Sequence, residues 1–480
     1  MRHTSMGWML LAAALLAATA DGGVRKPGWK PPAYHKLFTD EERAKPHVQA
    51  RSHDLQFWPF LDGQWEGIVT DSEGNVWFSV STHHDYEHAQ LFRYDVKNDR
   101  VNHIADVGQV CGEKLTGNPP QDKINGQMFE WGDSILTGTC EGHAIRGNPY
   151  KGGYWLKIDK RTGEVTNMGK TKTNDGLVNV DWDPWRKILY GMTNRTGELV
   201  RFDPTSGRET ILGVPQQDYI DAWKADTDPK KPKEIWPRSL TLMVAPNGKV
   251  YGDKRPACTI WEYDPPTGKI RNIEVDMPLP AKVAAGDAKA VARWKSGGLH
   301  MTLWDEHDQC FYAIRSADEM LIRFYPPTYD QAGKERKKAR VETVQAMGVG
   351  GPYPSCALVM MDRTLWYTPY TGWGGRTSLQ SYNLKTGTFT DHGPIVVEGD
   401  RRVNECHSTA AGKDGKLYLV AFVFSKEGTA DPVYPWAMRH KYPFHPRFVI
   451  IDPAKDCTRP VRDRPPVRPQ RPDARDQEAL

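Results

Sequence analysis

The chain has 480 residues, and its 64 Lys and Arg against 60 Asp and Glu leave a formal net charge of +4. So weak a positive balance argues against a nucleic-acid-binding protein, because such proteins carry a strong basic footprint. The hydrophobic fraction of 39% and the many Gly (43) and Pro (36) residues favour short strands joined by tight turns over long helices.

Residues 1–20 have the pattern of a secretory signal peptide. A basic start precedes an apolar run from Met9 to Leu16, and Ala18-Thr19-Ala20 provides the small residues of a cleavage site. No later stretch has the roughly 18 consecutive apolar residues that a membrane-spanning helix needs. We therefore expect a secreted or periplasmic protein without a membrane span.

Residues 21–60 form an irregular, Pro-containing extension, after which one sequence pattern repeats seven times. Its centre is a short apolar strand with an aromatic residue, or in one copy a leucine, in the middle. These central residues recur at intervals of 52 to 61 positions: Trp77, Leu136, Tyr190, Tyr251, Tyr312, Trp366 and Tyr418. The strand that follows ends in most copies with an aromatic or aliphatic residue and then Asp or Asn, as in Phe202-Asp203.

Several copies then enter the same kind of hairpin turn. Examples are Asp203-Pro204-Thr205-Ser206-Gly207 and Asp264-Pro265-Pro266-Thr267-Gly268. Asp and Pro favour the start of such a turn, and Gly adopts the left-handed conformation that the turn requires. Each copy therefore indicates a group of antiparallel strands, and repeats of this length are typical of blades around a channel.

The repeats predict an all-β fold, a seven-bladed β-propeller with four-stranded antiparallel blades, over residues 61–456. A strand from the extension is expected to complete the last blade near Phe448–Ile451. The final segment, residues 457–480, interleaves Arg and Pro and has few apolar side chains to bury, so we expect it to be disordered.

The hairpins and two Gly-Lys-x-Tyr strands resemble those of streptogramin-lyase-like and gluconolactonase-like propellers. These strands are Gly248-Lys249-Val250-Tyr251 and Gly415-Lys416-Leu417-Tyr418. They also resemble strands of the propeller polysaccharide lyases. The likeness covers residues 64 to 452 and implies the propeller fold. These motifs shape turns and carry no chemistry, and a fold does not specify a function.

The two rims of such a disc differ in sequence. The first rim carries the turns between the first and second strands of each blade, such as Pro246-Asn247-Gly248-Lys249, and we expect solvated hairpin turns and little else there. The second rim carries the second-to-third strand loops and the connections between blades, which are long. Long loops on a rigid scaffold concentrate binding residues, so we expect the functional face at the second rim.

The second-rim loops contain His, Arg and aromatic residues, a combination that suits an anionic, ring-shaped ligand such as an acidic sugar. Arg pairs with a carboxylate through two hydrogen bonds, and aromatic faces stack on sugar rings. The candidate catalytic residues are His84, His143 and Tyr370. The candidate substrate-binding residues are His83, Arg146, Arg238, Arg255, Arg315 and Trp373.

A second polar group lies at the starts of the inner strands, towards the channel mouth. Glu405 and His407 are two residues apart on one strand and so share a face, which suits a metal site or a base with its orienting partner. With His300, which could equally be a histidine of the core, they are the candidate ligands of one divalent cation (Ca, Mn or Zn). No organic cofactor is expected. His407 also resembles the metal-binding His of oligogalacturonide lyases.

These residues favour a lyase that cleaves a uronic-acid-containing polysaccharide or oligosaccharide by β-elimination. The reaction needs an Arg or a metal to neutralise the carboxylate, a His or Tyr to remove the C5 proton, and an acid to protonate the departing O4. Which His is the base and which the acid stays open. The partner would be an acidic glycan bound by a monomer, without nucleic acid.

Two alternatives belong to other functional classes. One is a metal-dependent lactonase or esterase of gluconolactonase type, in which Glu66, Asn125, Asp175 and Glu405 would ring a calcium ion that activates a water. The other is a non-catalytic glycan-binding propeller.

Overall fold

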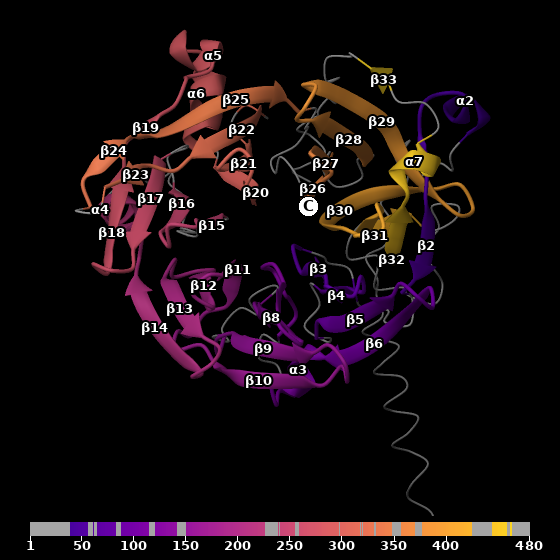
Figure 1. Cartoon of the computed structure of the whole chain (residues 1–480), viewed down its shortest axis with the longest axis horizontal. Helices are drawn as coiled ribbons and strands as arrows, with labels where there is room; N and C mark the ends of the chain where they lie inside the picture. Colours follow the sequence, from indigo (N-terminus) through magenta and orange to yellow (C-terminus); the bar gives the residue numbers. More distant parts are fainter. Residues whose placement is uncertain are drawn as a thin grey trace, which may run out of the picture.

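The computed structural model describes residues 39–55, 61, 65–82, 88–114, 121–141, 150–225, 239, 241–254, 259–296, 298–316, 318, 320–330, 333–347, 357–369, 377–424, 444–457 and 461–462. The described strands form a ring of small sheets around a central axis (Figure 1). The segment assigned to the signal peptide lies outside the described residues. Within them, no helix combines the length and apolar character that crossing a bilayer requires.

The described strands form seven four-stranded antiparallel blades, of which blades six and seven are joined into one continuous sheet by the pairing of β29 with β30. Blade one is β3 (Ile68–Thr70), β4 (Val76–Val80), β5 (Gln90–Asp95) and β6 (Arg100–Asp106). Blade two is β7 (Phe129–Trp131), β8 (Ser134–Gly138), β9 (Tyr154–Asp159) and β10 (Val165–Lys170). Blade three is β11 (Leu177–Asp183), β12 (Ile188–Thr193), β13 (Leu199–Asp203) and β14 (Arg208–Gly213). Blade four is β15 (Leu242–Val244), β16 (Val250–Lys254), β17 (Thr259–Asp264) and β18 (Lys269–Ile273).

The remaining three blades carry additions at their outer edges. Blade five is β20 (Leu299–Asp305), β21 (Cys310–Arg315), β22 (Met320–Tyr325) and β25 (Ala339–Ala346), with β19 (Val275–Asp276) parallel to β25. Blade six is β26 (Ala357–Met361), β27 (Thr364–Thr368), β28 (Ser378–Asn383) and β29 (Thr388–Val397), with β1 (Val48–Gln49) parallel to β29. Blade seven is β30 (Arg401–Ala411), β31 (Leu417–Phe424), β32 (Phe444–Ile451) and β2 (Arg51–Asp54). The strands β23 (Thr328–Tyr329) and β24 (Glu335–Lys337) form a separate hairpin.

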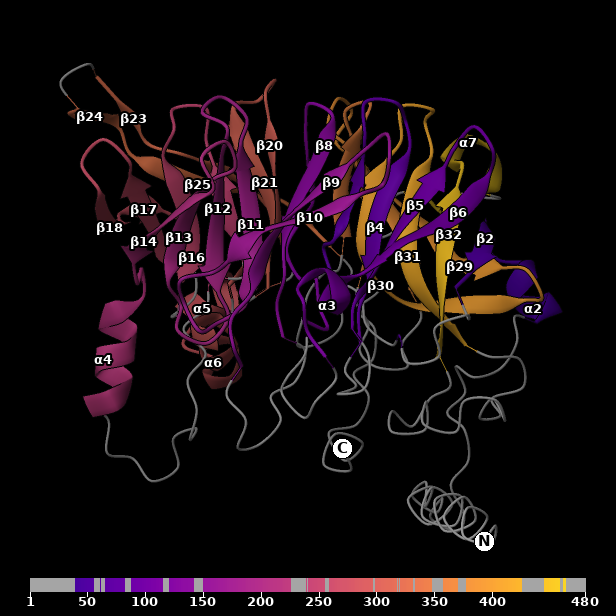
Figure 2. The same ribbon diagram turned by 90° about the horizontal axis from the view of Figure 1, so that it is seen from below.

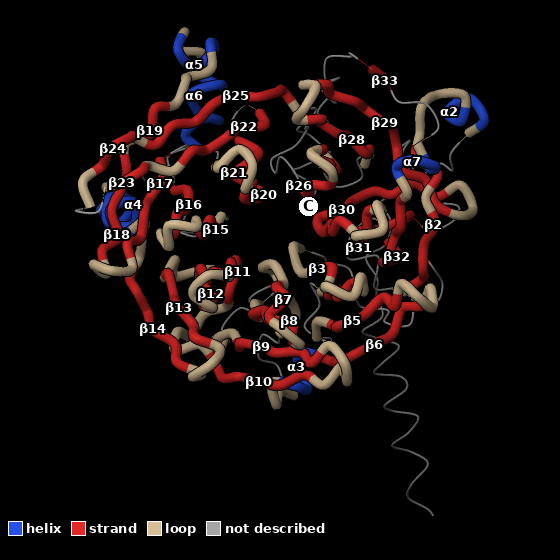
Figure 3. Tube along the Cα trace, in the orientation of Figure 1, coloured by secondary structure: helices blue, strands red, loops and turns tan. Residues whose placement is uncertain are grey.

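The described helices are short and lie at the periphery of the ring (Figure 3). They are α2 (Asp40–Arg43), α3 (Val107–Val110), α4 (Gln217–Ala225), α5 (Ala281–Ala284), α6 (Ala288–Ser296) and α7 (Pro453–Asp456). The helices α4, α5 and α6 belong to connections between blades, and they lie at the second-rim end of the strands (Figure 2). The two rims are therefore distinct faces of the disc.

The repeat identified in the sequence is the packing unit of the ring. Its seven central residues lie on the second strand of each blade, and all are buried. Each of seven clusters of buried apolar side chains joins two neighbouring blades. In the cluster between blades seven and one, the rings of Phe78 and Phe448 stack with centroids 4.6 Å apart. Burial of these apolar surfaces between blades holds the ring together.

The hairpin turns have the geometry that their sequence favours. In the turn between β13 and β14, a carboxylate oxygen of Asp203 accepts the backbone N–H of Thr205 at 2.9 Å. Gly207 closes this turn with a φ of 69°, a left-handed conformation that a residue with a Cβ adopts at a cost.

The ring is closed by a strand from the N-terminal extension. β2 pairs antiparallel with β32, with Ser52 opposite Val449, where the sequence analysis expects the closing strand. Asp99, in the outer hairpin of blade one, contacts Arg51 and accepts a hydrogen bond from Tyr94 at 2.7 Å. A ring nitrogen of His53 lies 2.9 Å from the same carboxylate. These contacts attach β2 to blade one, in addition to its pairing with β32 in blade seven.

Part of the C-terminal segment is ordered against blade six. Val461–Arg462 forms β33, which pairs with β29, Arg462 opposite Thr390. An outer edge strand such as β29 offers unpaired backbone N–H and C=O groups to an extended segment, which explains this pairing. Disorder over residues 457–480 stays a prediction. Residues 458–460 and 463–480 lie outside the described part.

Candidate functional site

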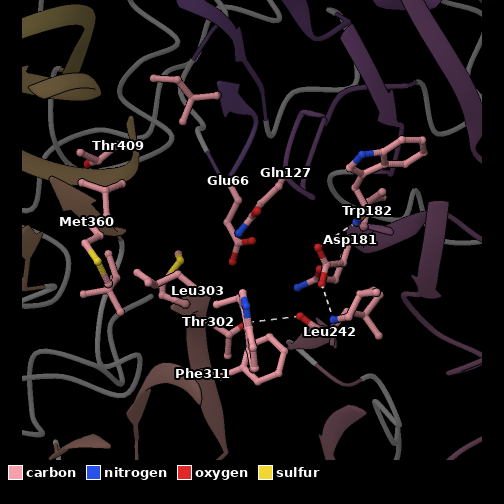
Figure 4. A pocket seen from close by; sticks show the side chains of 18 of the residues that line it. Glu66, Gln127, Asp181, Trp182, Leu242, Thr302, Leu303, Phe311, Met360 and Thr409 are labelled. Atoms are coloured by element: carbon pink, nitrogen blue, oxygen red, sulfur yellow. Dashed lines mark hydrogen bonds between the residues drawn. The ribbon is translucent and has the colours of Figure 1, made fainter. Parts of the chain in front are cut away.

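The axial channel contains a cavity of about 560 Å³, within the size range of small-ligand pockets (Figure 4). Every blade contributes lining residues. From the inner strands or the residues just before them these are Glu66, Ile68, Gln127, Asn179, Val180, Asp181, Trp182, Leu242, Val244, Met301, Thr302, Leu303, Trp304, Leu358, Val359, Met360, His407, Ser408, Thr409 and Ala411. The ring thus brings residues far apart in the sequence to one site.

Two carboxyl groups at the inner strands face this cavity, and a third, that of Glu306, lines it in a first-rim turn. Glu66, just before β3, and Asp181, on β11, both project into the space shown in Figure 4. Burial raises the pKa of Glu66, a hydrogen bond with Gln127 lowers it, and the negative charge of Asp181 raises it; together these effects bring it to about 8.

The Asp181 carboxyl is fixed by the backbone. Its two oxygens accept the N–H groups of Trp182 and Val244, each at 2.8 Å. Burial raises the pKa of Asp181 to about 7, and these two hydrogen bonds oppose the rise. Because Val244 belongs to blade four, the same contact joins blades three and four and sets the direction of the carboxyl.

Glu66 and Asp181 can each gain or lose a proton near neutral pH. A carboxyl group with a pKa of about 8 is mostly protonated at pH 7, and one with a pKa of about 7 is half ionised. A proton donor and a proton acceptor therefore face the same cavity. Perturbed carboxyl groups in a concave site are typical of general acid and base catalysts.

Glu405 and His407 are in direct contact, as their two-residue spacing suggests. The Nε2 atom of His407 meets a carboxylate oxygen of Glu405, which is buried, while His407 itself lines the cavity. The register of the pairing between β30 and β31 shifts between Val403 and Glu405 and again between Cys406 and Ser408. The arrangement is that of an imidazole oriented by a carboxylate.

Of the three candidate metal ligands, His407 lines the cavity, whereas His300, on β20, and Glu405 are not among its lining residues. Within the described residues, no group of three or more His, Cys, Asp or Glu side chains is arranged to hold a metal ion. The metal site predicted at His300, Glu405 and His407 stays a prediction.

The calcium ring of the lactonase hypothesis is not assembled either. The side-chain amide of Asn125 donates to the backbone oxygen of Val178 at 2.6 Å. Asp175 accepts the backbone N–H groups of Gly176, Arg195 and Thr196 at 2.6 to 2.8 Å. These contacts hold Asn125 against an inner strand of blade three and Asp175 against the loop between β12 and β13, so we derive no step through a metal ion.

The side chain of Arg315 makes contacts within the protein. Its side chain is buried at the end of β21, and its guanidinium donates two hydrogen bonds to Asp318, at 2.7 and 2.6 Å. It also lies over the ring of Trp294, 5.0 Å from the centroid. These contacts orient the guanidinium within the protein, and a role of Arg315 in substrate binding stays a prediction.

The other candidates of the sequence analysis lie outside the described residues: His83, His84, His143, Arg146, Arg238, Arg255, Tyr370 and Trp373. Their proposed roles at the second rim stay predictions.

The cavity reaches the first rim, which the sequence analysis set aside. Trp185, in the turn between β11 and β12, and Glu306, in the turn between β20 and β21, both line it. The expectation of plain hairpin turns is therefore wrong at these positions. The alternation of Asn179, Asp181 and Asp183 along an inner strand was the signal that could have drawn attention to Asp181, and a large aromatic residue in a tight turn was the signal for Trp185.

No family model matches the sequence. No curated protein matches it either. Solved β-propellers resemble the fold. A catalytically inactive virginiamycin B lyase from Staphylococcus aureus with quinupristin is 8% identical over 84% of this chain and 98% of that chain, with a TM-score of 0.45. The Cps50 propeller domain of Myceliophteria thermophila is 9% identical over 83% and 99%, with a TM-score of 0.49. The periplasmic gluconolactonase of Pseudomonas aeruginosa is 11% identical over 68% and 83%, with a TM-score of 0.41.

The lyase and the gluconolactonase belong to propeller groups that the hairpin motifs resemble. The fold assignment itself follows from the strand pairing of this chain.

Proposed function

We propose that the protein is an exported carbon–oxygen lyase that cleaves a uronic-acid-containing glycan by β-elimination in its axial channel. The observation that carries the proposal is the carboxyl pair of Glu66 and Asp181, which face one cavity with pKa values raised to about 8 and about 7. This pair supplies the two proton transfers that the reaction needs at neutral pH.

The two groups have different roles. Ionised Asp181 removes the C5 proton of the uronate, and the electron pair of that bond forms the C4=C5 double bond as the C4–O4 bond breaks. Protonated Glu66 gives its proton to the departing O4. The backbone N–H groups of Trp182 and Val244 favour the ionised form of Asp181, whereas burial and the neighbouring charge favour the protonated form of Glu66.

The uronate carboxylate must be stabilised as charge develops on it. The amide of Gln127 lines the same cavity, and Arg238 and Arg255 are the cationic candidates from the sequence. Apolar side chains, including Leu303, Phe311 and Met360, make up much of the remaining wall. By reducing the access of water they keep the carboxyl pKa values high and strengthen hydrogen bonds to the substrate.

The test is to incubate the protein with polygalacturonate, alginate and chondroitin and to follow the ultraviolet absorbance of the unsaturated product. We expect turnover of at least one of them, and a loss of about 10²- to 10⁴-fold in Glu66→Gln and Asp181→Asn. The matched control is Glu73→Gln, because Glu73 is exposed in a first-rim turn and should be dispensable.

Two outcomes contradict the proposal. Release of reducing ends without absorbance would mean hydrolysis instead of elimination. Tight binding of these glycans without any turnover would favour the non-catalytic glycan-binding propeller.

A further inference from the structure

One aromatic side chain at the first-rim end of the channel is unusually exposed. Among the described residues, the exposed large hydrophobic side chains are Trp185, Ile211 and Leu279, at 46%, 42% and 57%. Of these three, Trp185 alone lines the cavity. Other first-rim turns, such as Pro246-Asn247-Gly248-Lys249, have no aromatic residue, so turn formation does not explain Trp185.

The turn that carries Trp185 is held rigidly. A carboxylate oxygen of Asp183 accepts the backbone N–H groups of Trp185, at 3.1 Å, and Arg186, at 2.9 Å. The guanidinium of Arg186 pairs with the same Asp183, at 3.1 Å, and occupies the space that a side chain at Gly248 of blade four would need. The backbone that carries the indole is therefore fixed before a ligand binds, which reduces the conformational entropy that the protein would lose on binding.

The cavity wall also carries polar side chains. Gln127, Asn179 and Thr302 line it together with apolar residues. A sugar presents both hydroxyl groups and an apolar ring face, so it can form hydrogen bonds to such a wall while it stacks on an aromatic ring. An exposed aromatic side chain at the end of a cavity with this lining has the chemistry of a carbohydrate subsite.

We propose that Trp185 is a stacking platform for a sugar ring, and that the glycan enters the channel end-first through the first rim. The identification of the ligand as a uronic-acid glycan rests on the proposed function. The end-first direction is argued from the position of the two carboxyl groups. Glu66 and Asp181 lie at inner strands, and every blade contributes to the wall of their cavity, so a chain end reaches them along the axis.

The test measures binding without turnover. Titration calorimetry uses the full chain carrying Glu66→Gln, with trigalacturonate and the neutral cellotriose as the probes. Adding Trp185→Ala or Trp185→Leu should weaken binding of trigalacturonate about five- to tenfold, whereas Trp185→Phe should stay within about twofold, because the aromatic face is retained. Leu279→Ala, at an exposed apolar position away from the cavity, is the matched control and should bind like the parent.

The outcomes separate this inference from the proposed function. Weaker binding in the Ala and Leu variants, in a chain whose wild type turns over no glycan, would support Trp185 and refute the lyase. Unchanged affinity in both variants, with normal melting temperatures, would refute Trp185 whatever the enzyme does. Binding of cellotriose alone would keep the stacking role and exclude a uronate, and binding of neither sugar would refute both.

Discussion

Glu66 and Asp181 reach one cavity from blades one and three, and the negative charge of Asp181 raises the pKa of the Glu66 carboxyl. The two residues are therefore coupled, although more than a hundred positions separate them in the sequence. Removing the charge of Asp181, as in Asp181→Asn, should therefore lower the pKa of Glu66.

A buried histidine predicts how stability depends on pH. His392, in blade six, is buried against Trp366, and its Nε2 lies 2.9 Å from the hydroxyl of Ser381. Burial lowers the pKa of His392 to about 4 from its ordinary 6.5. Since the unfolded chain takes up this proton first, stability should fall as the pH drops from about 6.5 and level off below about 4.

The measurement is the melting temperature of the wild type and of His392→Gln between about pH 8 and pH 4. The variant should lose less stability over this range. His307→Gln is the control, because the side chain of His307 is 74% exposed. Parallel curves for wild type and His392→Gln would mean that His392 does not titrate in this way.

The ring closure makes a second prediction. Hydrogen bonds from Tyr94, Arg51 and His53 outweigh the effect of burial and lower the pKa of Asp99 to about 2. Asp99→Asn should lower the melting temperature by a few degrees, because it weakens the attachment of β2 to blade one. Asn is chosen since residue 99 has a φ of 50°, which Asn tolerates. The difference in melting temperature between the wild type and Asp99→Asn should be smaller at high salt. A difference that does not depend on salt would indicate an effect on packing instead of charge.

The sequence alone predicted the fold more completely than the functional site. The aromatic repeat located the buried position of every blade, because burial between blades selects one large side chain at a fixed place, as at Trp77 and Tyr251. The site was harder to predict. Glu66 was considered as a calcium ligand at the channel, but Asp181 was not selected, because its place in the cavity wall opposite Glu66 becomes evident only when the ring forms. Arg315 could not be separated from a binding arginine, since its partner Asp318 is evident only in the fold.

The C-terminal segment gives a third prediction, tested with two deletions. Removing residues 463–480 should leave the melting temperature within error, because this part has few apolar side chains to bury. Removing residues 459–480 also deletes β33 and its pairing with β29, so a small additional decrease is expected. A large decrease with the shorter deletion would show that the tail stabilises the ring.

The direction of substrate binding gives a fourth prediction. If the chain end is threaded into the closed ring, short unsaturated products should accumulate from the start while the viscosity of the polysaccharide solution falls slowly. Absorbance and viscosity measured on the same reaction test this. A rapid loss of viscosity at low product yield would mean cleavage within the chain and would contradict end-first binding.

The most direct test of the account is the dependence of kcat/KM on pH. In the wild type we expect a bell-shaped profile that falls below about pH 7, as Asp181 is protonated, and above about pH 8, as Glu66 loses its proton. In Glu66→Gln, residual activity should lack the alkaline limb, and the acidic limb should stay near pH 7, because Glu66 is uncharged while Asp181 titrates. A wild-type profile that is flat from about pH 6 to pH 9, or an alkaline limb that persists in Glu66→Gln, would contradict the assignment of this pair as acid and base.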